Sequence, residues 1–145
     1  MGRAIGATVV GYIVIACVTF AALTLAWVLL GADGAFRPGV FDVSMTWILI
    51  TIIVGVVAAL AGGRVARMIS KDATGPRLLA ALLVIMGVAA AVHAFGADPV
   101  SPARTGAMPM FEAISQTRMP LWSHLVNAVI GAVSALIGGS AMKCA

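Results

Sequence analysis

Two histidines are the residues of this chain whose type and spacing point most directly to chemistry. His93 lies about one helical turn before the end of one apolar segment, and His124 lies about one turn after the start of the next. Both segment ends are expected on the same side of a membrane, so the two imidazoles should lie at similar depth. Facing imidazoles can ligate a haem iron. With the nearby methionines they can instead bind Cu(I); these are Met108, Met110 and Met119.

The alternative interpretation treats both histidines as amphipathic residues whose ring tips reach the headgroup region. No paired-histidine motif of fixed spacing accompanies them, and the methionines can equally face lipid or fill gaps in the packing. We therefore expect no cofactor. Haem or copper bound by His93 and His124 is the alternative.

Asn127 is the most polar side chain inside an apolar segment. The other polar groups there are mostly hydroxyls, which can return a hydrogen bond to the backbone of their own helix. An amide is harder to satisfy in this way, so we expect Asn127 to form an interhelical hydrogen bond, with a role in a pore or ligand site as the alternative. No Asp, Glu, Lys or Arg lies within these segments away from their ends. Because ion-coupled transporters usually keep an ionisable group in the bilayer, any transported solute is expected to be small and neutral.

No enzymatic signature is found in the sequence. It contains no glycine-rich phosphate loop, no Cys-x-x-Cys and no His-Glu-x-x-His motif. Glu112 and Arg118 lie in a polar stretch without a catalytic constellation of His, Ser or Cys around them. Cys17 and Cys144 are expected at different depths, so we expect neither a disulfide nor a metal site between them. The sequence predicts a protein that is not an enzyme.

The composition fixes the environment of the chain. Of its 145 residues 62% are hydrophobic and 10% are charged, and the mean hydropathy is +1.12. Soluble domains have about 25% charged residues, and a helix of about 20 apolar residues spans a bilayer. The sequence therefore predicts an all-α integral membrane protein with a single membrane domain. Its four transmembrane helices are expected at about 7–31, 44–67, 77–97 and 120–141, with an outer loop at 98–119.

Local signals mark the helix ends. Gly31 opens a cluster typical of a helix stop, and Asp42 or Ser44 can cap the second helix. Pro76 is well placed in the first turn of the third helix. Within the outer loop, residues 110–116 are expected to form a short helix on the membrane surface.

The basic residues predict topology rather than nucleic-acid binding, although the net charge is +4. Six lie on one side of the predicted membrane: Arg3, Arg64, Arg67, Lys71, Arg77 and Lys143. Three lie on the other: Arg37, Arg104 and Arg118. This bias predicts that both termini are cytoplasmic.

Two residue groups are expected at the lipid headgroups. The basic cluster of Arg64, Arg67, Lys71 and Arg77 can bind an anionic headgroup, although topology alone accounts for it. Three aromatic residues near helix ends are expected in the interfacial belt, namely Trp27, Trp47 and Trp122.

A small-residue pattern occurs twice, in residues 55–63 and 131–139. Residues four apart share a helix face, so each copy presents a groove in which another helix backbone can come close. These faces are expected to pair the second and fourth helices or to bind a partner. Internal duplication and convergence on a packing motif both remain open. The packing residues are Gly55, Ala59, Gly62 and Gly63 in the first copy, and Gly131, Ala135, Gly138 and Gly139 in the second.

Three motifs resemble those of small, uncharacterised bacterial four-helix membrane proteins. They are Ala61-Gly-Gly-Arg-Val-Ala-Arg67, Pro120-Leu-Trp122 and Gly138-Gly139. The resemblance implies a four-helix bundle in a bacterial inner membrane, and it implies no particular activity.

The sequence thus predicts a non-enzymatic accessory or scaffold subunit, or a homo-oligomer. Its partners are expected to be the lipid bilayer and other membrane helices, of a second copy or of a partner subunit, and not nucleic acid. Two alternatives are a haem- or copper-binding protein and a small neutral-solute transporter or pore.

Overall fold

The fold is known from a computed structural model that describes residues 1–96, 103–104 and 109–140. Over these residues it is helical, apart from isolated bridges between loops. The helices are α1 (Gly2–Ala35), α2 (Met45–Ser70), α3 (Thr74–Phe95), α4 (Met110–Gln116) and α5 (Leu121–Ser140). All except α4 are long and apolar enough to cross a membrane. The predicted all-α architecture with four transmembrane helices is confirmed, and the chain is a multi-pass membrane protein.

The helix ends follow the local signals with one difference. Ser44 caps α2 by accepting a hydrogen bond from the backbone N–H of Trp47 at 3.1 Å, and Pro76 lies in the first turn of α3. Gly31 was expected to end the first helix. Instead α1 kinks at this residue, where φ is 64° and ψ is −173°, and continues to Ala35. A glycine adopts this left-handed φ without steric cost, so the chain bends at Gly31 and the helix continues instead of ending there.

The α2–α3 connection is a tight turn. Lys71 closes α2 in the left-handed conformation at φ 64°, and its backbone N–H donates to the carbonyl of Arg67 at 2.9 Å. The backbone N–H of Thr74 donates to Asp72 Oδ1 at 2.8 Å. This hydrogen bond lowers the pKa of the Asp72 carboxyl, because it stabilises the ionised form.

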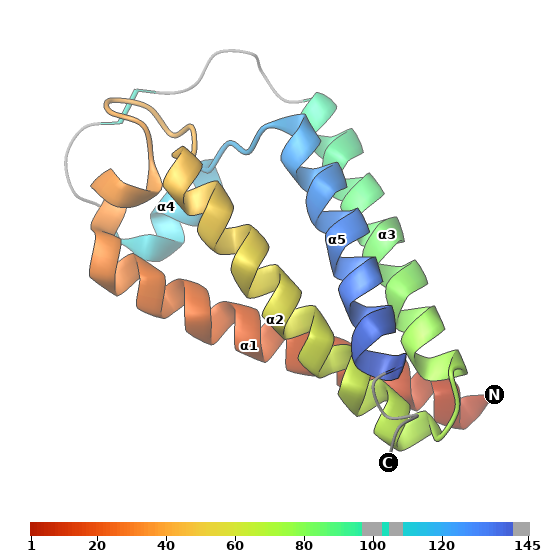
Figure 1. Cartoon of the computed structure of the whole chain (residues 1–145). Helices are drawn as coiled ribbons and strands as arrows, with labels where there is room; N and C mark the ends of the chain where they lie inside the picture. Colours follow the sequence, from red (N-terminus) through yellow and green to blue (C-terminus); the bar gives the residue numbers. More distant parts are fainter. Residues whose placement is uncertain (97–102, 105–108, 141–145) are drawn as a thin grey trace.

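The four long helices form a bundle that is narrow at one end and wide at the other (Figure 1). The narrow end contains the N-terminus, the α2–α3 connection and the end of α5. The wide end contains residues 36–44, α4 and the start of α5. Helix α5 packs against both α2 and α3, and α1 packs mainly against α2.

At the narrow end, helix backbones touch because small residues separate them. A Cβ atom added to Gly63 would overlap the backbone of Ala135, and one added to Gly138 would overlap the backbone of Leu60. These contacts join α2 to α5. A Cβ added to Gly62 would lie 2.6 Å from the carbonyl oxygen of Gly11, so α1 and α2 approach just as closely. Such close approach maximises dispersion contacts between helices in a membrane.

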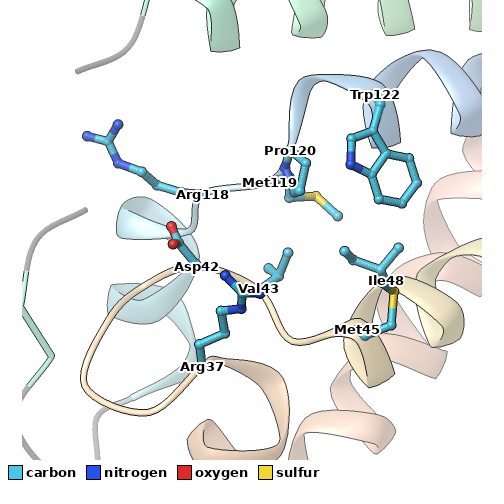
Figure 2. A pocket seen from close by; sticks show the side chains of 9 residues that line it. All are labelled: Arg37, Asp42, Val43, Met45, Ile48, Arg118, Met119, Pro120 and Trp122. Carbon is cyan, nitrogen blue, oxygen red and sulfur yellow. The ribbon is translucent and has the colours of Figure 1, made fainter. Parts of the chain in front are cut away.

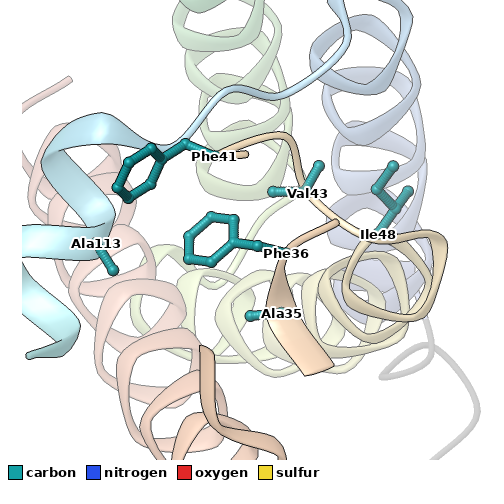
Figure 3. Close-up of a cluster of buried hydrophobic side chains, with 6 residues drawn as sticks. All are labelled: Ala35, Phe36, Phe41, Val43, Ile48 and Ala113. Atoms are coloured by element: carbon teal, nitrogen blue, oxygen red, sulfur yellow. The ribbon is translucent and has the colours of Figure 1, made fainter. Parts of the chain in front are cut away.

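At the wide end, larger side chains fill the space between the elements. Figure 3 shows the buried cluster there, which consists of Ala35, Phe36, Phe41, Val43, Ile48 and Ala113. Helix α4 forms over residues 110–116 as predicted, and it contributes Ala113 to this cluster while Phe111 and Ile114 are exposed. Arg104 holds residues 103–104 nearby, because its guanidinium donates to Asp33 Oδ1 at 2.6 Å and lies 6.0 Å from the Phe36 ring centroid.

Candidate functional site

His93 of α3 and His124 of α5 line one cavity of about 950 Å³ at the wide end, which we call the histidine cavity. The packing of Gly87 against Ala128 fixes the level of the two helices. From that contact, His93 lies about 9 Å along α3 and His124 about 6 Å along α5, both toward the wide end. The two imidazoles therefore lie at similar depth. His93 is exposed and His124 is half-buried.

Aromatic rings form much of the wall of this cavity. Trp27 meets Trp47 edge to face, with ring centroids 6.0 Å apart and planes at 84°. Trp27 meets Phe36 in the same manner, at 6.0 Å and 76°. Edge-to-face packing of this kind holds the rings in place more firmly than apolar contact alone. Both tryptophans were expected as belt residues; they are half-buried and pack against the wide-end cluster.

The rest of the lining combines apolar and hydrogen-bonding groups. Met110 and Met119 contribute thioethers, and Arg118 and Asp42 contribute opposite charges. The remaining residues of the lining are Leu23, Thr51, Ala90, Ala94, Ile114, Ser115, Gln116 and Thr117. An apolar wall with a few polar groups is typical of a site for a small organic molecule.

The residues available to a metal are few. No group of three or more His, Cys, Asp or Glu side chains occurs in the part of the chain that the structure describes. His93 and His124 share the histidine cavity with Met110 and Met119. Met108, also considered as a copper ligand, lies outside the described residues, as do Lys143 and Cys144.

Asn127 was expected to form an interhelical hydrogen bond, and the described part of the chain contains no such bond. Asn127 is half-buried on α5, and its side chain has no hydrogen bond to any residue within 1–96, 103–104 or 109–140. The spacing from Asn127 through Gly131 to Gly138 places all three on one stripe of α5. Gly138 meets α2 at the narrow end. Toward the wide end α2 and α5 lie farther apart, since a Cβ added to Gly131 would contact Leu83 of α3 and no atom of α2 in the part of the chain that the structure describes.

The predicted packing residues fall into two groups, because α2 and α5 are in close contact at the narrow end and farther apart toward the wide end. Ala59, Ala135, Gly62, Gly63, Gly138 and Gly139 are all buried. Gly55 and Gly131 differ, because they lie toward the wide end. A Cβ added to Gly55 would meet no atom within 4 Å, and one added to Gly131 would meet only Leu83 Cδ1, at 3.7 Å.

The basic cluster lies around the narrow end. Arg64, Lys71 and Arg77 are exposed and Arg67 is half-buried. Arg3 joins them, since its Nε donates to the carbonyl oxygen of Ile69 at 2.7 Å.

A second, smaller cavity at the wide end was not foreseen from the sequence. It measures about 400 Å³, and we call it the Arg37 cavity (Figure 2). Its lining consists of Arg37, Asp42, Val43, Met45, Ile48, Arg118, Met119, Pro120 and Trp122. Asp42, Arg118 and Met119 also line the histidine cavity. Backbone hydrogen bonds hold Arg118 against the loop that contains Asp42. The N–H of Arg118 donates to the Phe41 carbonyl at 3.0 Å, and the N–H of Val43 donates to the Arg118 carbonyl at 3.2 Å.

The wide end thus holds two cavities, and the narrow end holds close helix contacts. The ligand chemistry that these residues can offer is hydrogen bonding, aromatic contact and one pair of imidazoles, all beside the apolar faces of membrane-spanning helices. No protein-family model, no curated protein and no solved structure matches this chain.

Proposed function

We propose that this protein is a non-enzymatic membrane protein that binds a neutral, lipid-soluble molecule with a ring-bearing polar head in the histidine cavity. One observation carries the proposal. Two histidines from different helices, His93 and His124, line a single cavity whose wall includes the edge-to-face pair of Trp27 and Trp47.

The size and polarity of the cavity support this class of ligand. Its volume of about 950 Å³ is at the upper end of the range for small-molecule sites, about 300–1,000 Å³. Indole faces favour contact with a flat ring, and an imidazole can donate a hydrogen bond to a carbonyl or hydroxyl or accept one from a hydroxyl. Gln116 adds further donors and an acceptor at the same cavity. The ligand's head is expected among these groups.

The charge of the lining supports a neutral ligand. Among the described residues of its lining, Arg118 and Asp42 alone have a formal charge when histidine is counted as neutral, and their charges are opposite. An anionic ligand would meet the carboxylate of Asp42 as well as the guanidinium of Arg118. A neutral head avoids that repulsion and costs less to remove from water.

The location of the cavity supports entry from the bilayer. Helix α2 has 26 residues, or about 39 Å at 1.5 Å per residue, and the hydrocarbon core is about 30 Å thick. The helix ends therefore extend into the headgroup region, with the cavity just below it. An apolar tail can lie along other exposed side chains of α3 and α5, such as Met86 and Leu125.

The proposed setting is the inner membrane of a bacterium, with both termini in the cytoplasm. The excess of Lys and Arg around the narrow end supports this orientation. The wide end and both cavities would then face the other side. Because the buried small residues pack α2 against α5 within one chain, we assign them to folding and place no partner subunit there.

The test is a binding titration of the detergent-purified protein with a decyl-substituted benzoquinone, followed by calorimetry. We expect saturable binding that weakens about tenfold in His93→Ala or His124→Ala, since a lost hydrogen bond costs about 1.4 kcal/mol. Val92→Ala is the matched control, because Val92 neighbours His93 and is exposed outside the cavity lining. Binding that is equally strong in the double histidine variant would overturn the proposal, as would the absence of saturable binding.

Haem or copper is the second candidate ligand, favoured by the shared cavity of His93, His124, Met110 and Met119. The measurement is an ultraviolet–visible spectrum, oxidised and then reduced, of protein purified gently from its native membrane. A Soret band that disappears in His93→Ala would support haem. Metal analysis of the same sample tests for colourless Cu(I).

A further inference from the structure

We infer that the Arg37 cavity binds the headgroup phosphate of an anionic phospholipid. This site shares Asp42, Arg118 and Met119 with the histidine cavity, and it differs from that cavity in Arg37 and in the rest of its apolar wall. Figure 2 shows Arg37 extending from its loop toward the space between Asp42, Val43 and the start of α5.

The net charge of this cavity suits a single negative charge. Its lining holds Arg37, Arg118 and Asp42, which gives a formal sum of +1. The side chain of Arg37 makes no hydrogen bond or ion pair within the described ranges of the chain, whereas Arg104 is bound to Asp33 at 2.6 Å. A guanidinium presents a planar fork of donors that matches a phosphate group. Arg37 is thus a cation available to an anion that enters the cavity.

The loop that carries Arg37 is held in place before any ligand arrives. The backbone N–H of Arg37 donates to the Asp42 carbonyl at 2.8 Å, and Gly39 takes the left-handed conformation at φ 74° that the turn requires. Phe36 and Phe41, which flank the turn, are buried in the wide-end cluster. A fixed loop loses little conformational freedom on binding, which favours affinity.

The depth of the cavity matches a headgroup. Met45 begins α2 and Trp122 lies in the first turn of α5, and both line the cavity. Helix ends of this kind lie at the membrane interface, where tryptophan is enriched. A phosphate bound at Arg37 would lie at the level of the other headgroups of its leaflet.

The helix surfaces below the cavity suit acyl chains. Met45, Leu49 and Ile53 are exposed and four residues apart, so they form one apolar stripe down α2. Trp122 and Val129 form a similar exposed stripe down α5. Together with the charge, these stripes select a whole phospholipid over a free phosphate ion.

The test uses native mass spectrometry of the protein released from bilayers that mix phosphatidylglycerol and phosphatidylcholine. We expect the parent protein to retain phosphatidylglycerol preferentially and Arg37→Gln to lose about tenfold of that retention. Arg64→Gln is the matched control, because it removes the same charge from the same type of exposed residue at the narrow end. Arg37→Lys keeps the charge and should retain an intermediate amount, which separates loss of the site from loss of the fold.

Three outcomes would overturn the inference. The first is a parent protein that shows no preference for phosphatidylglycerol. The second is an equal loss in Arg37→Gln and Arg64→Gln, which would assign the lipid to charge in general. The third is displacement of the lipid by millimolar inorganic phosphate, which would identify a free anion as the ligand.

Discussion

The two ends of the bundle differ in how closely the same four helices pack. At the narrow end, Gly63 and Gly138 allow α2 and α5 to touch backbone to backbone. At the wide end, Trp27, Trp47 and Phe36 keep the elements apart, and the space between them forms cavities. At the narrow end, close packing stabilises the bundle and leaves no space between these helices. At the wide end, bulky side chains prevent such close packing and leave space for cavities. The location of the two cavities in the bundle therefore follows from the size of the residues between the helices.

One of the two largest expected effects comes from adding one methyl group to the narrow end. Gly63→Ala places a Cβ where the backbone of Ala135 lies, so α2 and α5 must separate. We expect a loss of about 3 kcal/mol in the free energy of unfolding, as for other overpacked interiors. The measurement is reversible unfolding in mixed micelles, followed by circular dichroism.

Gly55→Ala is the matched control for this prediction. It makes the same chemical change on the same helix, where a Cβ would meet no atom within 4 Å. We expect no loss of stability, and a gain of up to about 1 kcal/mol from helix propensity. If Gly55→Ala destabilised the protein as much as Gly63→Ala, the two ends would not differ in packing.

A second prediction tests the wide end by removing volume. Phe41 is 2% exposed in the cluster beneath the loop, so Phe41→Ala should cost about 3 kcal/mol through a new cavity. The loss should be local, with increased hydrogen exchange in residues 36–44 and α4. Phe20→Ala is the control, because Phe20 is exposed on α1 and its loss leaves no cavity. Equal destabilisation by both changes would contradict the structure.

The smallest expected change in the free energy of unfolding is for Asn127 of α5, toward the wide end. Asn127 has no hydrogen bond within the described ranges, so Asn127→Leu should change the free energy of unfolding by less than about 0.5 kcal/mol. The change can be measured by the same unfolding assay. A loss of more than about 1 kcal/mol would show that Asn127 has a polar partner, and that the helices meet farther toward the wide end.

The helices could be predicted from sequence because the bilayer constrains them. A spanning segment must be apolar and about 20 residues long, and this criterion predicted the four spanning helices, although α1 covers Gly2–Ala35 rather than about 7–31. Local chemistry fixed several details as well: Ser44 caps α2, and α4 covers residues 110–116. Gly31 was recognised as a special position, but the sequence could not distinguish a kink from a helix end, since both use a left-handed glycine.

The cavities could not be predicted from the sequence. The spacing of residues along a helix indicates which of them share a face, but it does not indicate which other element packs on that face. Gly55 and Gly63 are equivalent in the repeated pattern, yet only Gly63 is in close contact. The divergence of α2 and α5 depends on how the wide-end aromatic residues pack, which joins residues from α1, the loop and α2. Arg37 was counted only as a loop charge, because its place in one cavity with Trp122 depends on the path of two separate connections.

The length of α1 sets how the protein fits its bilayer. The helix has 34 residues, or about 51 Å if straight, and α5 has 20 residues, or about 30 Å. Helix α1 is strongly inclined to α3 and α5 in the bundle (Figure 1). This tilt shortens its projection on the membrane normal and reduces the hydrophobic mismatch between the two helices. A thicker bilayer would oppose the tilt of α1, so membrane thickness acts directly on the angle that opens the wide end.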